Sequence, residues 1–145
     1  MTHGRLGIVA CPMLEDELVH SLSEDKEEKR ILVLNTPYNG SLKKKLEWKK
    51  LKYEEVDETD FMNGWIDIDP NQFNVIIKMN NLGLHAEPAK LKEFVQDELV
   101  MLSGRIDAAG LYYGMCGNYG WDITKWSEEH LPFKVEVFRD CKGRV

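Results

Sequence analysis

The stretch that decides the fold is LGIVACPMLEDELVHSLSEDKEEKRILVL, residues 6–34. It opens with the short apolar run Leu6–Ala10 and closes with the uninterrupted apolar run Ile31–Leu34. Uninterrupted runs of this length are typical of parallel strands that are covered on both faces. Between the two runs, apolar residues recur at helical spacing: Leu14, Leu18, Val19 and Leu22. Residues 6–34 therefore predict a strand, a helix and a second strand.

The rest of the chain continues the alternation. Further strands are predicted over residues 73–79, 108–113 and 133–138, and helices over 42–51, 88–102 and 121–129. The helix over 88–102 has the clearest signals, because Pro88 suits a first helical turn and Gly104 is a natural stop. Residues 53–72 are predicted to be a loop that contains a short strand or a short helix.

Strands that alternate with helices predict an α/β fold, a doubly wound domain with a mostly parallel, five-stranded sheet. We expect residues 1–145 to form one domain with the Rossmann-like strand order 3-2-1-4-5, numbered along the chain; the alternative order is 2-1-3-4-5. The last predicted strand ends seven residues before Val145, where such a domain usually adds a helix. We therefore expect a C-terminal truncation.

Composition and net charge indicate which classes of partner to expect. The chain has 145 residues, of which 43% are apolar, and 25 acidic residues against 19 basic ones give it a formal net charge of −6. This balance disfavours nucleic acid and anionic membranes and favours a small-molecule ligand or a protein partner. No signal peptide and no run of 18 apolar residues is recognisable, so we expect a cytoplasmic protein.

Three cysteines are the main functional signal. An odd number in a chain without secretory features disfavours a disulfide framework. Cys11, Cys116 and Cys141 each follow the end of a predicted strand, at the edge where open α/β sheets bind ligands. In the order 3-2-1-4-5 these strands are neighbours about 4.8 Å apart, so the three thiols can meet at one centre. The order 2-1-3-4-5 makes a shared site harder to build.

Thiolates at one centre predict a metal ion or metallocofactor: tetrahedral zinc, an iron–sulfur cluster, or cobalt in a corrinoid. His85 is the best fourth ligand, because it lies in the loop after the third predicted strand. Glu15 and Asp140 are oxygen-donor alternatives. None of the cysteine spacings forms a CxxC knuckle. Two other interpretations stay open: buried cysteines that pack as small apolar residues, and a Cys116 nucleophile activated by the following helix.

A glycine-rich turn follows the fourth predicted strand. Gly114, Gly117 and Gly120 are spaced G-x-x-G-x-x-G, so backbone N–H groups can face an anion or allow a flat cofactor to approach. Asn118 and Tyr119 add polar contacts to this predicted cofactor-binding site. The alternative is a tight turn that needs positive φ. The run is neither a Walker loop nor a G-x-G-x-x-G fingerprint, which disfavours ordinary ATP or NAD binding.

Three segments carry a family resemblance. Tyr113–Gly117, read with Ile8–Leu18 and with Asp140-Cys141, resembles the uncharacterised domain-of-unknown-function family 1638, which has methanogen and bacterial members. Met115 departs from the acidic residue expected there in many relatives, which puts a catalytic carboxylate in doubt. The resemblance implies an association with methanogenesis, specifically corrinoid-dependent methyl transfer, and hence a methyl-transfer protein as partner.

The sequence thus predicts a cytoplasmic protein that binds a metal or metallocofactor through cysteines at the carboxyl edge of its sheet. The alternative is a non-catalytic binding or accessory module for a small anionic or planar ligand, or for a partner protein. The sequence does not decide whether the protein is an enzyme.

Overall fold

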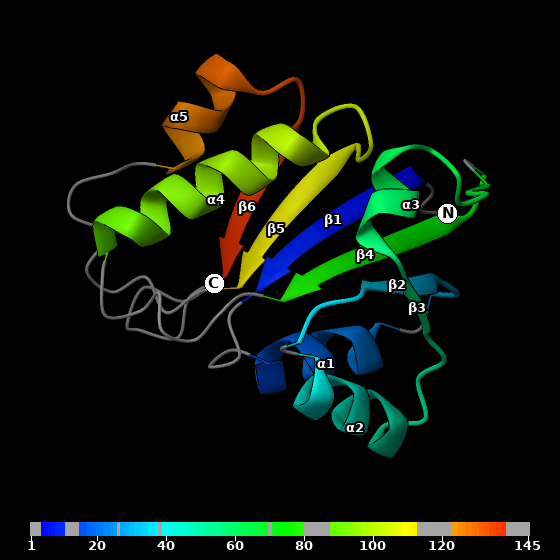
Figure 1. Cartoon of the computed structure of the whole chain (residues 1–145). Helices are drawn as coiled ribbons and strands as arrows, with labels where there is room; N and C mark the ends of the chain where they lie inside the picture. Colours follow the sequence, from blue (N-terminus) through cyan, green and yellow to red (C-terminus); the bar gives the residue numbers. More distant parts are fainter. Residues whose placement is uncertain are drawn as a thin grey trace.

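A computed structural model describes residues 4–10, 15–25, 27–37, 39–69, 71–79, 88–112 and 123–138. They contain a six-stranded sheet in the order β3-β2-β4-β1-β5-β6, in which every pairing is parallel (Figure 1). The strands are β1 Gly4–Ala10, β2 Arg30–Leu34, β3 Glu54–Val56, β4 Phe73–Met79, β5 Ala108–Tyr112 and β6 Lys134–Phe138.

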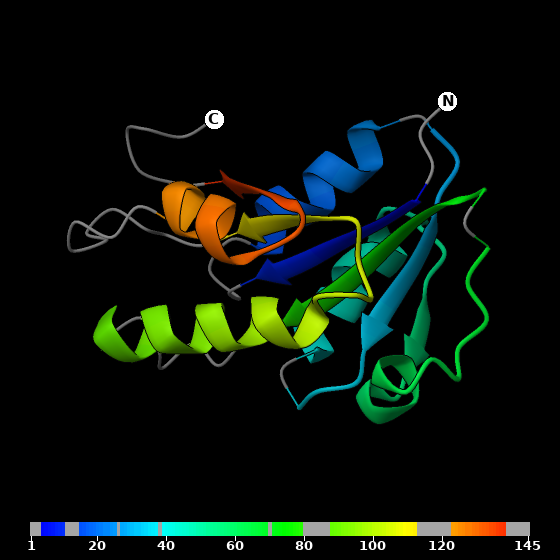
Figure 2. The ribbon, with the colours of Figure 1, turned by 90° about the horizontal axis from the view of Figure 1, so that it is seen from above.

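Helices cover both faces of the sheet. They are α1 Glu15–Glu24, α2 Gly40–Trp48, α3 Glu58–Met62, α4 Pro88–Leu102 and α5 Ile123–His130. Helices α1 and α2 lie on one face, whereas α3, α4 and α5 lie on the other (Figures 1 and 2). This three-layer arrangement follows from strands that are apolar on both sides, because each face must be removed from water.

Two cores lie between these layers, and alternate strand residues supply them. Val9, Leu32 and Ile76 belong to the core with Phe61 of α3 and Leu99 of α4. The residues next to them in sequence face α1 and α2 instead; this second core contains Ile8, Ile31, Val33, Val75, Ile77, Leu18 and Leu46. The period of two in a strand thus divides continuous apolar runs between two buried layers.

The doubly wound α/β class predicted from the sequence is confirmed, but two details differ. The sheet has six strands, and the predicted third strand, β4, lies between β2 and β1. The predicted orders 3-2-1-4-5 and 2-1-3-4-5 are therefore both wrong in the position of this strand. Burial excludes the edge position that the first order gives it: five of the seven residues of β4 are buried, as a central strand requires. The second order already has this strand at the centre but is wrong in its neighbours, because β4 pairs with β2 and β1.

The edge position goes to β3, which lies within the segment predicted to be loop, short strand or short helix. Its three residues are exposed or half-buried, and among the described strands it pairs with β2 alone. The same segment also contains α3, whose first turn begins after the N-cap Asp57, where the carboxylate accepts from the backbone N–H of Asp60 at 3.1 Å. Charged residues on a short exposed edge strand are a usual feature of sheets.

The other predicted helices are close to those observed. The helix over 88–102 has the predicted bounds, and Gly104 after it has a φ of +88°. No helix within the described ranges combines the length and apolar character needed to cross a bilayer.

Candidate functional site

The predicted site residues lie outside the described residues. This holds for the metal ligands Cys11, Cys116, Cys141 and His85, for the alternative ligand Asp140, and for the glycine-turn residues Gly114, Gly117, Asn118, Tyr119 and Gly120. Within the described ranges, no group of three or more His, Cys, Asp or Glu side chains is arranged to hold a metal ion. The strand ends that precede the predicted ligands are described, and they define where each connection starts.

Four strand ends stand in a row at the carboxyl edge of the sheet. Ala10 of β1 is paired with Met79 of β4 on one side and with Tyr112 of β5 on the other. Tyr112 is in turn paired with Phe138 of β6. The arrowheads of β4, β1, β5 and β6 therefore lie side by side (Figure 1). At about 4.8 Å per strand, the row is about 14 Å wide.

Each predicted metal ligand comes shortly after one of these four ends. Cys11 directly follows Ala10, Cys116 is four residues after the end of β5, and Cys141 is three residues after the end of β6. His85 is six residues after the end of β4. An extended chain covers about 3.3–3.6 Å per residue, so a connection of three or four residues is long enough to reach a neighbouring strand.

Glu15, the alternative oxygen donor that is described, is already engaged. Its side chain is 2% exposed, and Oε1 accepts from Ser41 Oγ at 2.6 Å and from Lys45 Nζ at 2.7 Å. Lys45 also pairs with Asp16 at 2.8 Å. Burial disfavours the Lys45 cation, but its bonds with Asp16 and Glu15 outweigh this effect and raise the pKa of Lys45. The other carboxylate oxygen of Glu15, Oε2, is buried and has no hydrogen-bond partner among the described residues.

The beginning of α2 is held by the buried Asn39, which directly precedes Gly40. The Nδ2 group of Asn39 donates to the carbonyl of Leu34 at 2.9 Å and to Glu55 Oε2 at 3.2 Å. Its Oδ1 accepts from Thr36 Oγ1 at 3.0 Å. These bonds fix the segment that follows β2 against β3. Ser41, which is a good capping residue type, instead bonds Glu15.

A third polar group at this edge joins β4 to α3 and α4. Lys78, one residue before the end of β4, forms an ion pair with Glu58 of α3 and another with Glu98 of α4 at 3.4 Å. Burial raises the pKa of Glu98, although the Lys78 cation opposes this effect. Oε2 of Glu98 is buried without a partner. The sequence signal for this group is a single lysine within the apolar run Val75–Met79.

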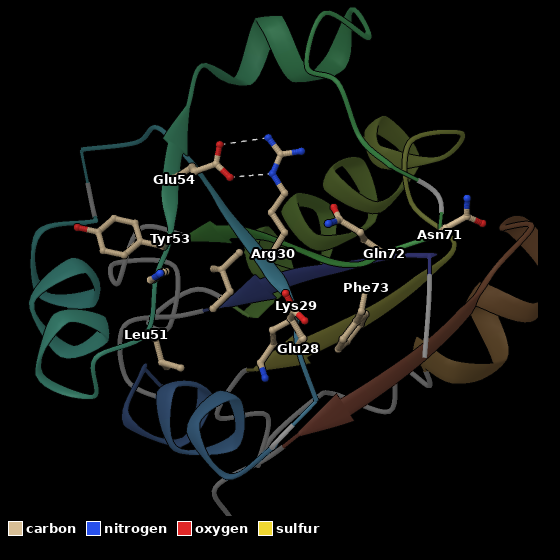
Figure 3. Close-up of a pocket in the computed structure, with 11 residues that line it drawn as sticks. Glu28, Lys29, Arg30, Leu51, Tyr53, Glu54, Asn71, Gln72 and Phe73 are labelled. Carbon is tan, nitrogen blue, oxygen red and sulfur yellow. Dashed lines mark hydrogen bonds and ion pairs between the residues drawn. The ribbon is translucent and has the colours of Figure 1, made fainter. Parts of the chain in front are cut away.

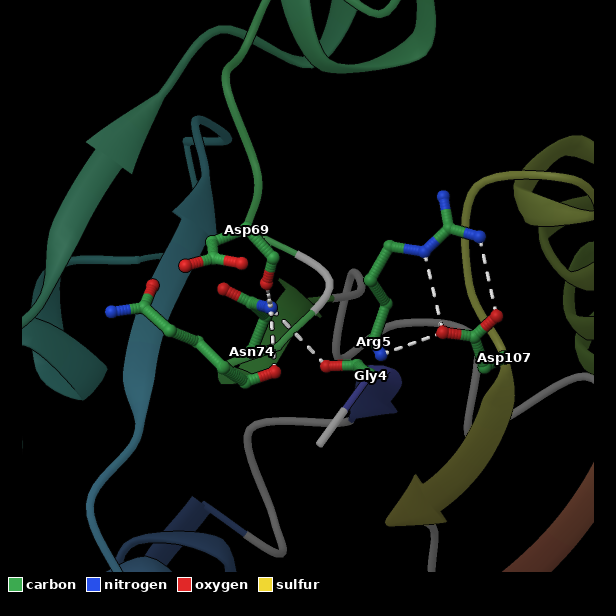
Figure 4. A network of polar contacts seen from close by, with 6 residues as sticks. Gly4, Arg5, Asp69, Asn74 and Asp107 are labelled. Atoms are coloured by element: carbon green, nitrogen blue, oxygen red, sulfur yellow. Dashed lines mark hydrogen bonds and ion pairs between the residues drawn. The ribbon is translucent and has the colours of Figure 1, made fainter. Parts of the chain in front are cut away.

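The opposite, amino edge of the sheet is fixed by a separate network (Figure 4). Asp107 accepts from the backbone N–H of Arg5 at 2.8 Å and from its guanidinium Nη2 at 3.2 Å. Asn74 Nδ2 donates to the carbonyl oxygens of Gly4 at 3.2 Å, Asp69 at 3.0 Å and Gln72 at 3.1 Å. These bonds tie the beginnings of β1, β4 and the segment before β5 together, which supports the strand register at the other edge.

Comparison of the chain with protein-family models, with curated proteins and with solved structures gives no match. The resemblance to family 1638 stays a prediction.

Proposed function

We propose that this α/β protein binds a metal ion or metallocofactor at the carboxyl edge of its sheet. Cys11, Cys116 and Cys141 are the proposed ligands, with His85 as the fourth. The observation that supports this proposal most strongly is the adjacency of β4, β1, β5 and β6, whose paired ends come one to six residues before the four ligands along the chain.

The observed strand order favours this ligand set more than the order predicted from the sequence. In the order 3-2-1-4-5, the strand before His85 is two positions away from the strand before Cys11. In the observed order, β4 is the direct neighbour of β1. All four connections therefore begin on consecutive strands, and the imidazole no longer has to cross a strand to join the thiolates.

The ligand chemistry selects the class of metal. Three thiolates and an imidazole suit zinc or an iron–sulfur cluster. The cobalt of a corrinoid, which is already held by its ring nitrogens, would take only one or two of these ligands. The glycine-rich run Gly114–Gly120 contains Cys116, and its small residues would let a planar cofactor approach the backbone. If the fourth position were left to solvent or a substrate instead of His85, the metal would supply Lewis-acid activation of a thiol or a methyl acceptor. This chemistry agrees with the methyl-transfer partner that the family resemblance implies.

Anaerobic purification followed by elemental analysis and an absorption spectrum tests the proposal. We expect zinc, iron or cobalt in a stoichiometric ratio to the chain. Cys116→Ser should lose the metal, because it removes one of the thiolates. His85→Gln should weaken metal retention, whereas His20→Gln, at an exposed position on α1, is the matched control and should retain it. A metal-free protein with three freely alkylated thiols would overturn the proposal.

A further inference from the structure

A cavity of about 690 Å³ lies at the amino edge of the sheet (Figure 3). It is bounded by the beginning of β2, by the segment that leads into β3 and by the beginning of β4. β4 has seven residues, each with a rise of about 3.3 Å, so the cavity is about 20 Å from the carboxyl edge. The proposed metal site does not include it. Its volume is in the range of small-molecule sites.

One wall of the cavity is apolar and incompletely covered. Leu51, Tyr53 and Phe73 line it and are only half-buried, although they pack against the core between the sheet and α1 and α2. In Figure 3, Leu51 and Tyr53 lie on one side and Phe73 on the other. A flat apolar group placed between them would remove this surface from water, at about 25 cal/mol per Å².

The lining charges are unequally neutralised. Lys29, Arg30 and Lys52 line the cavity together with Glu28 and Glu54. Arg30 forms a fork with Glu54, in which Nε and Nη2 donate to the two carboxylate oxygens at 2.7 and 3.1 Å. Lys29 donates to two backbone carbonyl oxygens at 2.9 and 3.0 Å and pairs with a carboxylate outside the cavity.

Lys52 is the cation that these bonds leave available. It is exposed, and within the described ranges no carboxylate lies within ion-pair distance of it. Lys49 and Lys50, immediately before the lining segment, are also exposed and form no ion pair with a described residue. The exposed Glu28 is the opposing charge among the lining residues, and Lys49 and Lys50 add positive charge beside Lys52.

The cavity is also lined by uncharged polar side chains, whose hydrogen bonds could orient a ligand. The hydroxyl of Tyr53 donates to Glu47 Oε2 at 2.6 Å, and this bond, together with burial, raises the pKa of Tyr53 to about 12. The phenol is therefore uncharged at neutral pH. Asn71 and Gln72 are exposed at the lining, where their side-chain amides can bond a ligand.

We infer that this cavity binds a small organic monoanion with a flat apolar body, such as an aromatic carboxylate. The ring lies between Tyr53 and Phe73, and the carboxylate faces Lys52. An apolar wall combined with one available cation fits this class better than a neutral ring, which leaves Lys52 unpaired, or a polyanion, which has no apolar contact.

Titration of the full chain with 1-naphthoate, followed by the backbone amide signals in two-dimensional NMR, tests the inference. We expect saturable shifts that are largest in residues 51–54 and 71–73. The matched neutral probe, 1-naphthamide, should bind about three- to fivefold more weakly, which is the range for a partly exposed charge pair. Lys52→Gln should weaken naphthoate by a similar factor and leave naphthamide unchanged. Lys44→Gln, at another exposed lysine, is the control and should bind both probes as the wild type does.

Three results would overturn the inference: equal affinity for naphthoate and naphthamide, unchanged naphthoate affinity in Lys52→Gln, or shifts centred away from the cavity. None of these depends on metal, because the titration can be run on protein from which metal has been removed by chelation. Failure here therefore leaves the metal-site proposal intact, and loss of metal binding leaves this one intact.

Discussion

Replacement of Gly7 by alanine should destabilise the protein, because the space beside Gly7 is already filled. A Cβ at this position would lie 2.6 Å from Cδ1 and 2.9 Å from Cγ2 of Ile106, which is 3% exposed and belongs to the core under α4. Gly7 is in the middle of β1 and is paired with Ala109 of β5. The contact therefore joins the middle of β1 to the segment that leads into β5, and both of these strands precede proposed ligands.

The magnitude follows from two opposing effects. Adding a methyl group to a filled core costs about 1–3 kcal/mol. Alanine also lowers the conformational entropy of the unfolded chain, which stabilises the folded protein by about 0.4–1 kcal/mol. This gain applies here because Gly7 is not among the positions with positive φ. The net expectation is a loss of about 1–2 kcal/mol, measurable as a lower midpoint of urea unfolding with an unchanged slope.

A double-mutant cycle tests the cause. Ile106→Ala removes Cδ1 and Cγ2 and leaves the Ile106 Cβ at 3.5 Å, an ordinary contact for an alanine at position 7. The cost of Gly7→Ala should therefore fall by about 1 kcal/mol or more when Ile106 is already alanine. Gly40→Ala is the matched control, because nothing lies within 4 Å of its added Cβ, and it should not destabilise. Strict additivity of the two changes, or a neutral Gly7→Ala, would refute the reasoning.

Three further predictions concern single side chains. Burial raises the pKa of Glu98, so the stability that Glu98 contributes is fully present below the ordinary pKa of 4.5 and is lost as the pH rises through the raised pKa. In urea unfolding, Glu98→Gln should therefore be as stable as the wild type at pH 4 and more stable at pH 7.5, with Glu93→Gln, at an exposed position, as the control. Asn74→Ala should cost about 1–3 kcal/mol and Asn74→Asp more at neutral pH, because a carboxylate would face three carbonyl oxygens; recovery of the aspartate variant in acid is the check. Lys50 has a φ of +58°, so Lys50→Gly should raise the unfolding free energy by up to about 1 kcal/mol, and a loss in thermal unfolding would contradict this.

The strands and helices with strong local signals could be predicted from the sequence. The run Ile31–Leu34 is apolar throughout. It makes up the four buried residues of the five-residue strand β2. The helix over 88–102 has a proline in its first turn and a glycine after its end, and these residues fix its bounds. Both signals are local, so they are readable without knowledge of the neighbours.

The strand order could not be predicted, because it depends on contacts that are distant in sequence. Nothing within Phe73–Met79 states that this strand inserts between β1 and β2. Its two buried faces favour a central position, whereas the cysteine positions favour the order 3-2-1-4-5, which places this strand at the edge. β3 was equally hard to recognise, since Glu54 and Glu55 lack strand propensity and become a strand only by pairing with β2.

The contacts of the polar groups at the carboxyl edge could not be predicted either, because they too join residues that are distant in sequence. Lys78 stands out in an apolar run, but its partners Glu58 and Glu98 are 20 residues away on either side. Glu15 is the first residue of α1. Its hydrogen bond with Ser41, however, depends on how α1 packs beside α2. Residue type and position therefore make Glu15 a candidate ligand near the carboxyl edge, and only the packing shows that it is already engaged.

The central claim is that cysteines from neighbouring strand ends share one metal. X-ray absorption at the edge of the bound metal in anaerobically purified protein tests it most directly, because it counts sulfur ligands. We predict three protein thiolates per chain at the metal centre, at about 2.3 Å for zinc, and two in Cys116→Ser if metal is retained. A metal shell without sulfur, or a sulfur count unchanged by Cys116→Ser, would contradict the account.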